Sequence, residues 1–157
     1  MKYLKTILFS TILLVTTAIS AQDISKNALG IRVGDNDGFG GEISYQRYMS
    51  DNNRLEFDLG FRNSNKVDAF KLVALYQWVN VIDTNFNWFI GAGAGFGSFN
   101  APINDGTFIL AAADLGIEYN FNIPIVMSLD IRPELGFNDN YSDDLDLDIA
   151  LGIRYQF

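Results

Sequence analysis

The chain is 157 residues long, the length of a single domain, and carries 11 basic against 19 acidic side chains, for a formal net charge of −8. Nucleic acid is excluded as a partner, because phosphate binding needs clustered Lys and Arg rather than an acidic surface. Cysteine and histidine are both absent, which excludes disulfide bonds and any catalytic triad whose base is histidine.

The first part of the chain predicts a secretory signal peptide at 1–21. Two lysines precede an apolar run at 7–15, and small residues follow it, the last of them Ala21. The order is that of an export signal, and the run is shorter than the ~20 apolar residues of a membrane-spanning helix. We expect cleavage after Ala21, or after Ser20, and a mature domain at 22–157.

From residue 27 onward, apolar and polar side chains alternate in successive runs, and turn-forming residues follow the runs. Alternation with period two is typical of strands that expose two different faces. The runs predict eight strands, at 27–34, 38–49, 54–62, 67–78, 86–99, 107–121, 125–137 and 146–157. No helical period, linker or second domain interrupts them. We therefore predict an all-β fold, an eight-stranded antiparallel up-and-down transmembrane β-barrel.

The two faces of these strands differ in kind. One is apolar, and the other carries six cations and eight anions: Arg32, Arg54, Arg62, Lys71, Arg132, Arg154, Glu42, Glu56, Asp58, Asp114, Glu118, Asp130, Glu134 and Asp148. A membrane barrel turns its polar face inward and its apolar face to lipid, whereas a soluble barrel does the reverse. Arginine is the commonest cation of the set, and it suits enclosed ion pairs. We predict an interior polar network, in which paired carboxylates such as Glu56 and Asp58 hold arginines rather than act as an acid and a base.

Aromatic residues mark the ends of the apolar face. One end, on the side of the chain termini, carries Tyr45, Tyr76, Trp78, Trp88, Tyr119, Phe121, Tyr155 and Phe157, and the other carries Phe39, Phe61, Phe70, Phe96 and Phe137. Amphipathic rings favour the headgroup level of a bilayer. Only Arg47 intrudes in this face, near a strand end. The pattern predicts a lipid-facing surface between two aromatic girdles.

The last strand, 151–157, alternates and ends on Phe157, and a glycine-rich run stands at 90–97. With the segment at 129–134, these features make the mature chain resemble the eight-stranded outer-membrane barrels of OmpA and OmpX type. The resemblance implies a Gram-negative outer membrane, with both termini periplasmic and Phe157 as the signal read by the barrel-insertion machinery. It implies outer-membrane lipids and lipopolysaccharide as partners. The long outer loops of these families are missing here.

In that orientation the outer connections would lie near 35–38, 63–66, 100–106 and 138–145, and the periplasmic turns near 50–53, 79–85 and 122–124. The acidic segments 35–38 and 139–148 could hold calcium, but neither has the full twelve-residue ligand pattern. Solvated turns are the preferred interpretation, and a weak role in binding divalent cations near lipopolysaccharide stays open.

The glycines at 91, 93, 95 and 97 do not form a phosphate loop, because Phe96 occupies the third glycine position and no helix follows. We expect them to face the lumen beside longer charged side chains, or to let the strand bend. No metal site, cofactor site or enzyme activity is predicted.

The sequence thus favours an integral outer-membrane barrel with a structural or small binding role and no open pore. An alternative is an accessory subunit that docks laterally on a larger outer-membrane transport, secretion or assembly complex. The small outward residues Ala92, Ala94, Ala111 and Ala113 would form its contact patch. A soluble periplasmic barrel with an apolar ligand cavity is a further alternative.

Overall fold

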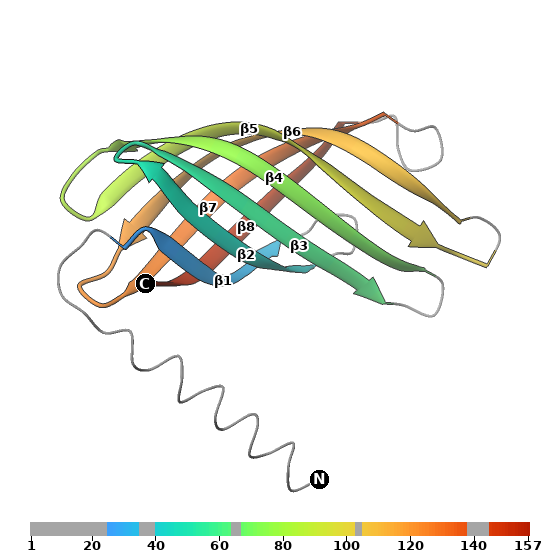
Figure 1. Cartoon of the computed structure of the whole chain (residues 1–157), viewed down its shortest axis with the longest axis horizontal. Helices are drawn as coiled ribbons and strands as arrows, with labels where there is room; N and C mark the ends of the chain where they lie inside the picture. The colour runs from blue at the N-terminus through green and yellow to red at the C-terminus, as the bar shows by residue number, and fades with distance from the viewer. Residues whose placement is uncertain (1–24, 35–39, 64–66, 103–104, 138–144) are drawn as a thin grey trace, which may run out of the picture.

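The computed structural model describes residues 25–34, 40–63, 67–102, 105–137 and 145–157. It is a closed antiparallel barrel in which each strand pairs with its chain neighbours (Figure 1). The strands are β1 (Asn27–Gly34), β2 (Gly41–Ser50), β3 (Asn53–Asn63), β4 (Asp68–Val81), β5 (Phe86–Asn100), β6 (Asp105–Asn120), β7 (Ile125–Gly136) and β8 (Leu145–Gln156). The predicted eight-stranded up-and-down barrel is confirmed. In the described part of the chain, no helix is long and apolar enough to cross a bilayer.

The barrel closes where β1 meets β8. Asn27 N–H donates to the Phe157 carbonyl at 3.1 Å, and Phe157 N–H donates back to the Asn27 carbonyl at 2.8 Å. The start of β1 and the end of β8 therefore lie at the same end of the barrel (Figure 1). Closure satisfies backbone donors and acceptors that an open sheet edge would expose.

Strand boundaries agree with the prediction to within a few residues. The largest differences, of three residues each, are at the end of β4, predicted at Trp78 and found at Val81, and at the start of β2. The extension occurs because Val79 and Val81 continue the ladder opposite Phe89 and Asn87. The second strand begins at Gly41 rather than 38, after Gly40 has taken a positive φ of 44° that suits glycine in a turn.

Several predicted features lie outside the described residues. They are Phe39, all of the connection at 35–38, most of those at 63–66 and 138–145, and the centre of that at 100–106. The first calcium candidate and most of the second fall there as well. The end of the barrel where β1 begins and β8 ends is called the end with the termini. The connections after β2, β4 and β6 lie at this end, where the periplasmic turns were expected.

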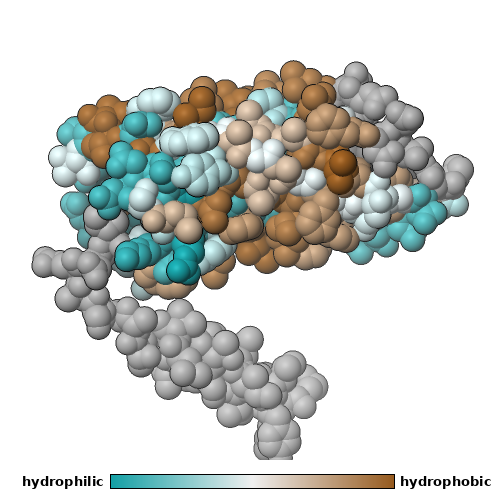
Figure 2. Space-filling view, turned by 45° about the horizontal axis from the view of Figure 1, so that its top comes forward, coloured by the Kyte–Doolittle hydropathy of each residue, from teal (hydrophilic) through white to brown (hydrophobic). Residues whose placement is uncertain are grey.

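Burial is inverted relative to a soluble protein. Outward side chains such as Ile31 and Leu115 are 54% and 51% exposed, whereas Arg132 and Lys71 are 0% exposed. Hydrophobic residues cover much of the middle of the molecule, and hydrophilic residues gather toward its ends (Figure 2). The face that alternation marked as apolar is thus the outside of the barrel.

The lumen is not uniformly polar. Inward side chains of β4 and β6 form an apolar cluster, consisting of Val73, Leu75, Phe108, Leu110 and Ala112, with Phe99 packed against it. The other strands contribute most of the buried charges. The interior therefore has a charged wall on β1–β3, β7 and β8. It has an apolar wall on β4–β6, bordered by the buried charges of Lys71, Asp114 and Glu118.

Candidate functional site

The residues predicted to form an interior network point into the lumen. All of them are buried except Arg62, which is half-buried: Arg32, Glu42, Arg54, Glu56, Asp58, Lys71, Asp114, Glu118, Asp130, Arg132, Glu134, Asp148 and Arg154. They come from seven of the eight strands, β5 being the exception, because every second residue of a strand faces inward. Their contacts fall into three groups.

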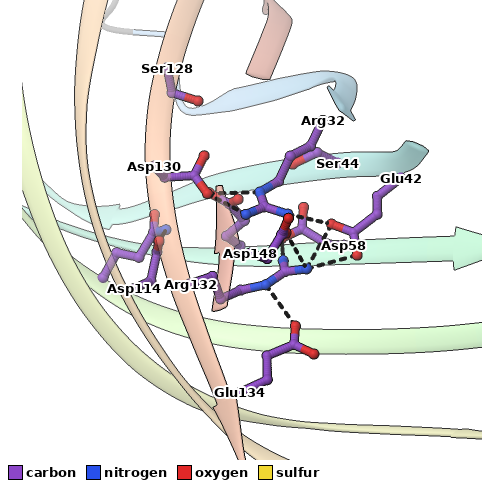
Figure 3. Close-up of polar contacts among 12 residues, drawn as sticks. Arg32, Glu42, Ser44, Asp58, Asp114, Ser128, Asp130, Arg132, Glu134 and Asp148 are labelled. Atoms are coloured by element: carbon purple, nitrogen blue, oxygen red, sulfur yellow. Dashed lines mark hydrogen bonds and ion pairs between the residues drawn. The ribbon is translucent and has the colours of Figure 1, made fainter. Parts of the chain in front are cut away.

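Arg32 is at the centre of the first group. Its Nη1 lies 3.0 Å from Glu42 Oε2 on the neighbouring strand, and its Nε donates to Asp130 Oδ1 at 2.9 Å from β7. Its Nη1 also pairs with Asp148 of β8. Figure 3 shows these carboxylates reaching the guanidinium from different strands. Arg32 thus joins the first strands of the barrel to the last two.

Arg132 extends the same group across the lumen. Its Nη1 lies 2.8 Å from Asp58 Oδ2, and its Nη2 lies 2.8 Å from Glu42 Oε1. Glu134 Oε1 is 2.8 Å from its Nε, and Lys71 Nζ is 2.9 Å from Glu134 Oε2. Glu42 therefore binds both central arginines, and charge-assisted contacts of this kind are the strong ones.

Arg154 organises the second group. Its Nη2 lies 2.9 Å from Glu56 Oε1, and it donates to the hydroxyls of Ser44 and Ser128, each at 2.8 Å. A Cβ at Gly152 would lie 2.4 Å from both Arg154 Nη1 and Ser128 Oγ, so glycine makes room for the guanidinium. The two serines were not predicted. Their inward position on strands was the available signal.

The third group lies toward the end with the chain termini. Arg54 pairs with Glu118 Oε2 at 2.5 Å, donates to Gln77 Oε1, and lies over the Phe89 ring at 4.7 Å. Gln77 in turn donates to Asp114. The Gln77 amide therefore stands between a guanidinium and a carboxylate that do not touch.

Charge is not balanced among the buried groups. They comprise eight carboxylates and five cations. One carboxylate oxygen each of Asp58, Asp114 and Asp148 has no hydrogen-bond partner in the described structure. Within the described residues, Asp114 has no cation within ion-pair distance. Asp114 is therefore the least compensated carboxylate of the three.

The carboxylates of the interior network are arranged for ion pairing rather than for acid–base catalysis. The candidate acid–base carboxylates Glu56 and Asp58 are each engaged by an arginine, Arg154 and Arg132 respectively. Both carboxylates are buried, at 2% and 0% exposed. Among the residues that the structure describes, no group of acidic side chains is arranged to hold a metal ion.

The glycine-rich run of β5 faces the lumen, as predicted. Charged residues flank it only at its two ends, where Gly91 lies opposite Asp114 and Gly97 lies opposite Lys71. A Cβ at Gly97 would lie 2.4 Å from the Phe108 ring, and one at Gly95 would lie 3.1 Å from Val73 and Leu110 side-chain atoms. These glycines lie under the apolar cluster. The physical reason is that β4 and β6 place apolar residues on both faces, so the lumen beside β5 is filled by bulky hydrophobic side chains.

Aromatic contacts mark the ends of the outer surface. At the end with the termini, ring centroids of Tyr76 and Trp78 are 5.1 Å apart, and Tyr119 lies 4.8 Å from Phe86 and from Phe121. At the opposite end, Phe70 and Phe96 meet edge to face at 6.2 Å. The described members of both predicted girdles thus lie near the two ends of the barrel.

The outer surface also has a shallow hollow of about 410 Å³ over β5 and β6. It is lined by Ala94, Gly95, Phe96, Ile109, Leu110, Ala111 and Phe137. Two residues of the predicted alanine patch, Ala94 and Ala111, thus line this hollow.

Comparison with known proteins locates the fold. No family model matches the chain, and no curated protein matches its sequence. The N-terminal β-barrel domain of Pseudomonas aeruginosa OprF is similar, with 12% identity and a TM-score of 0.69 over 87% of this chain and 100% of that chain. Neisserial surface protein A has 13% identity and a TM-score of 0.62 over 83% and 94%.

A third similar structure is Ail, the attachment invasion locus protein of Yersinia pestis, with 17% identity and a TM-score of 0.55 over 83% of this chain and 96% of that one. At such identities the likeness is one of fold. The chain has the fold of the small eight-stranded outer-membrane β-barrels.

Proposed function

We propose that this chain is an integral outer-membrane β-barrel with a structural or small binding role, no catalysis and no open pore. The observation that carries the proposal is the inversion of burial: thirteen charged side chains are enclosed, and alternate apolar ones face outward between aromatic girdles. Lipid is the environment in which that arrangement is stable, because it buries the apolar surface and leaves the charges enclosed in the lumen.

The proposal includes a route to the membrane. Residues 1–21 act as the export signal, both termini of the mature barrel are periplasmic, and Phe157 is read by the insertion machinery. The short connections at the end that carries the termini support this orientation, since outer-membrane barrels have short periplasmic turns. Outer-membrane lipids and lipopolysaccharide are then the surrounding partners.

Fractionation tests the membrane assignment. We expect the mature protein in the outer-membrane fraction, resistant to carbonate extraction, and migrating differently on gels before and after boiling. Mature protein found soluble in the periplasm would refute the proposal and favour a barrel with an apolar ligand.

The face assignment has its own test. Leu115 is 51% exposed in the middle of β6, so Leu115→Arg should cost about 2–4 kcal/mol of folding free energy in lipid vesicles. The inward neighbour Gly116 reports on lumen space instead, because its Cβ would lie 2.4 Å from the Phe89 ring. An unchanged stability for Leu115→Arg would mean that this face does not meet lipid.

Conductance tests the closed lumen. Ion pairs cross the interior from β1 to β7, from β3 to β6 and from β3 to β7, and eight strands enclose a lumen that side chains can fill. We expect no large, steady conductance in planar bilayers. A well-defined channel from the unmutated protein would favour a porin.

Lateral docking on a larger outer-membrane complex is the second candidate function. The observation that favours it is the hollow at Ala94 and Ala111, where small side chains permit close approach of another surface. A gentle pull-down from membranes, with Ala111→Leu as the matched variant, separates it from the first candidate. Loss of a copurifying barrel in the variant would support docking.

A further inference from the structure

The ladder between β6 and β7 is interrupted in the middle of β6. Ala112 pairs with Glu134, and pairing resumes at Leu115 and Ile131. The two pairs are three residues apart on both strands, so no residue is inserted and the register is unchanged. The interruption falls at Pro133, and the other two prolines of the chain lie outside the strands. Because proline has no N–H, it removes a ladder hydrogen bond here.

The hydrogen-bond pattern of this seam identifies the group that loses its partner. Phe137 N–H donates to the Ile109 carbonyl at 3.1 Å, and in an antiparallel ladder every second residue pair exchanges hydrogen bonds in this way. Four residues further along each strand, Ala113 and Pro133 occupy a position of the same kind. An N–H at position 133 would donate to the Ala113 carbonyl. Pro133 therefore leaves this carbonyl without its donor from β7.

The next residue of β6 has an unpartnered acceptor as well. Asp114 is 3% exposed, and its Oδ2 accepts a hydrogen bond from Gln77, while its Oδ1 has no partner in the described structure. A buried acceptor without a donor is less stable than a hydrated one. Water admitted at this point of the seam would therefore hydrate two adjacent groups, the Ala113 carbonyl and the Asp114 carboxylate.

The ion pairs of the lumen tie β6 and β7 to distant strands. Arg132 of β7 stands opposite Asp114 in the register, but its guanidinium pairs with Glu42 of β2 and Asp58 of β3 (Figure 3). Glu118, the other charged inward residue of β6, pairs with β3 as well. These ion pairs therefore do not hold β6 against β7, and the seam depends on its backbone ladder.

We propose that the β6–β7 seam at Pro133 is the place where the closed barrel opens locally: the two strands separate over a few residues, and water from the lumen reaches Ala113 and Asp114. The inference rests on the proposed function, because lipid on the outside leaves the lumen as the source of water. Opening here breaks one hydrogen bond fewer than at an uninterrupted seam, and it hydrates two acceptors. Both differences lower the free energy of local opening.

The β1–β8 seam is the appropriate comparison, because a barrel could instead open where its first and last strands meet. Its ladder is uninterrupted from Ala28 to Gly34, and Arg32 of β1 pairs with Asp148 of β8 across it. Each ladder acceptor there has a strand donor, and an ion pair joins the two strands. We expect this seam to stay paired while the β6–β7 seam opens.

Amide hydrogen exchange measures the opening. The full mature protein is inserted into phospholipid nanodiscs, and NMR gives the protection factors of Leu115 and Leu135, which flank the interruption, and of Ile31 and Ile153 in the β1–β8 seam. All four occupy hydrogen-bonded positions of their ladders. We expect protection about tenfold lower at Leu115 and Leu135, the effect of one hydrogen bond on the opening equilibrium. Equal protection at the two seams, or lower protection in the β1–β8 seam, would overturn the inference.

Pro133→Ala supplies the missing N–H. It should raise the protection of Leu115 and Leu135 about tenfold and leave the β1–β8 amides unchanged. Leu147→Ala is the matched control, because Leu147 of β8 lies opposite Pro133, and the change removes an outward side chain without adding a donor. Protection that Pro133→Ala does not raise, or that Leu147→Ala raises equally, would show that the missing donor is not the cause.

A second variant tests the hydration of the open seam. Asp114→Asn keeps the size of the side chain and removes its charge. It should raise the protection of Leu115 by a smaller factor than Pro133→Ala does, because a neutral amide gains less from water than an unpaired carboxylate. Unchanged protection would overturn the part assigned to Asp114. A barrel that inserts, with its gel shift, yet has uniform protection would overturn this inference and leave the proposed function standing. A chain that fails to insert would contradict the proposed function itself.

Discussion

The charged wall and the apolar wall of the lumen fill the same space by opposite means. On β1–β3, β7 and β8, long side chains from distant strands meet in ion pairs, such as Arg32 with Asp130 and Asp148. On β4–β6, glycines on β5 leave room for Phe108 and Leu110 from the next strand. The charged wall depends on ion-pair partners, and the apolar wall depends on glycines that have no side chain. They should therefore fail in different ways when mutated.

The largest effect is expected at the centre of the charged wall. Arg132→Ala removes the one described ion-pair partner of Asp58. It also takes one cation each from Glu42 and Glu134, which keep Arg32 and Lys71 respectively. The change should cost about 3–5 kcal/mol, because three contacts at 2.8 Å are lost together. Urea unfolding of the barrel in lipid vesicles measures it. Ile131→Val, the outward neighbour, is the control and should cost far less. Equal effects would show that the ion pairs add nothing to the packing.

On the apolar wall, adding a side-chain atom at a glycine should destabilise the barrel. The Cβ of Gly97→Ala would lie 2.3 Å from the Phe70 carbonyl and 2.4 Å from the Phe108 ring. Overpacking of this kind typically costs about 1–3 kcal/mol. Gly41→Ala, where a Cβ meets nothing within 4 Å, is the matched control in the same unfolding assay. A Gly97→Ala barrel as stable as the Gly41→Ala barrel would remove the distinction between the walls.

The smallest effect is expected at Asp114, on the boundary between the walls. It has a hydrogen bond from Gln77 but no described cation within ion-pair distance, so Asp114→Asn removes a poorly compensated charge at little loss. We expect stability unchanged or raised by up to about 1 kcal/mol. Asp130→Asn breaks the pair with Arg32 and should destabilise the barrel in the same assay. A severe loss at Asp114 would indicate that it holds a cation.

The two walls also differ in how far the sequence predicts them. Alternation identifies each inward residue separately and needs no knowledge of its ion-pair partner. Arg32, Glu42 and Asp148 were therefore all predicted to lie in the lumen. Their pairing was not predictable, because β1–β8 contacts depend on how the closed barrel staggers its strands. Ser44 and Ser128 were not included in the predicted network, because serine is neither charged nor strongly apolar and so does not by itself mark a network position.

The apolar wall carries a weaker signal. Val73 and Leu75 face inward while Leu72 and Ala74 face outward, so this stretch of β4 is apolar on both faces and alternation gives no contrast. The glycines of β5 were placed correctly in the lumen, but their neighbours depend on which strands flank them. Arg62 shows a different limit, since it follows the alternation yet is only half-buried near the end of β3.

The junction of Arg32 with β7 and β8 bears on how the chain assembles. Its carboxylate partners Asp130 and Asp148 lie 98 and 116 residues away in sequence. These contacts form only when the last strands have returned to the first, which is a slow, non-local event. A barrel that has not closed therefore has unpaired charges in its interior and unpaired strand edges in lipid. Pairing of β1 with β8 removes both costs at once. The network therefore destabilises a partly closed barrel relative to both the closed barrel and the unfolded chain.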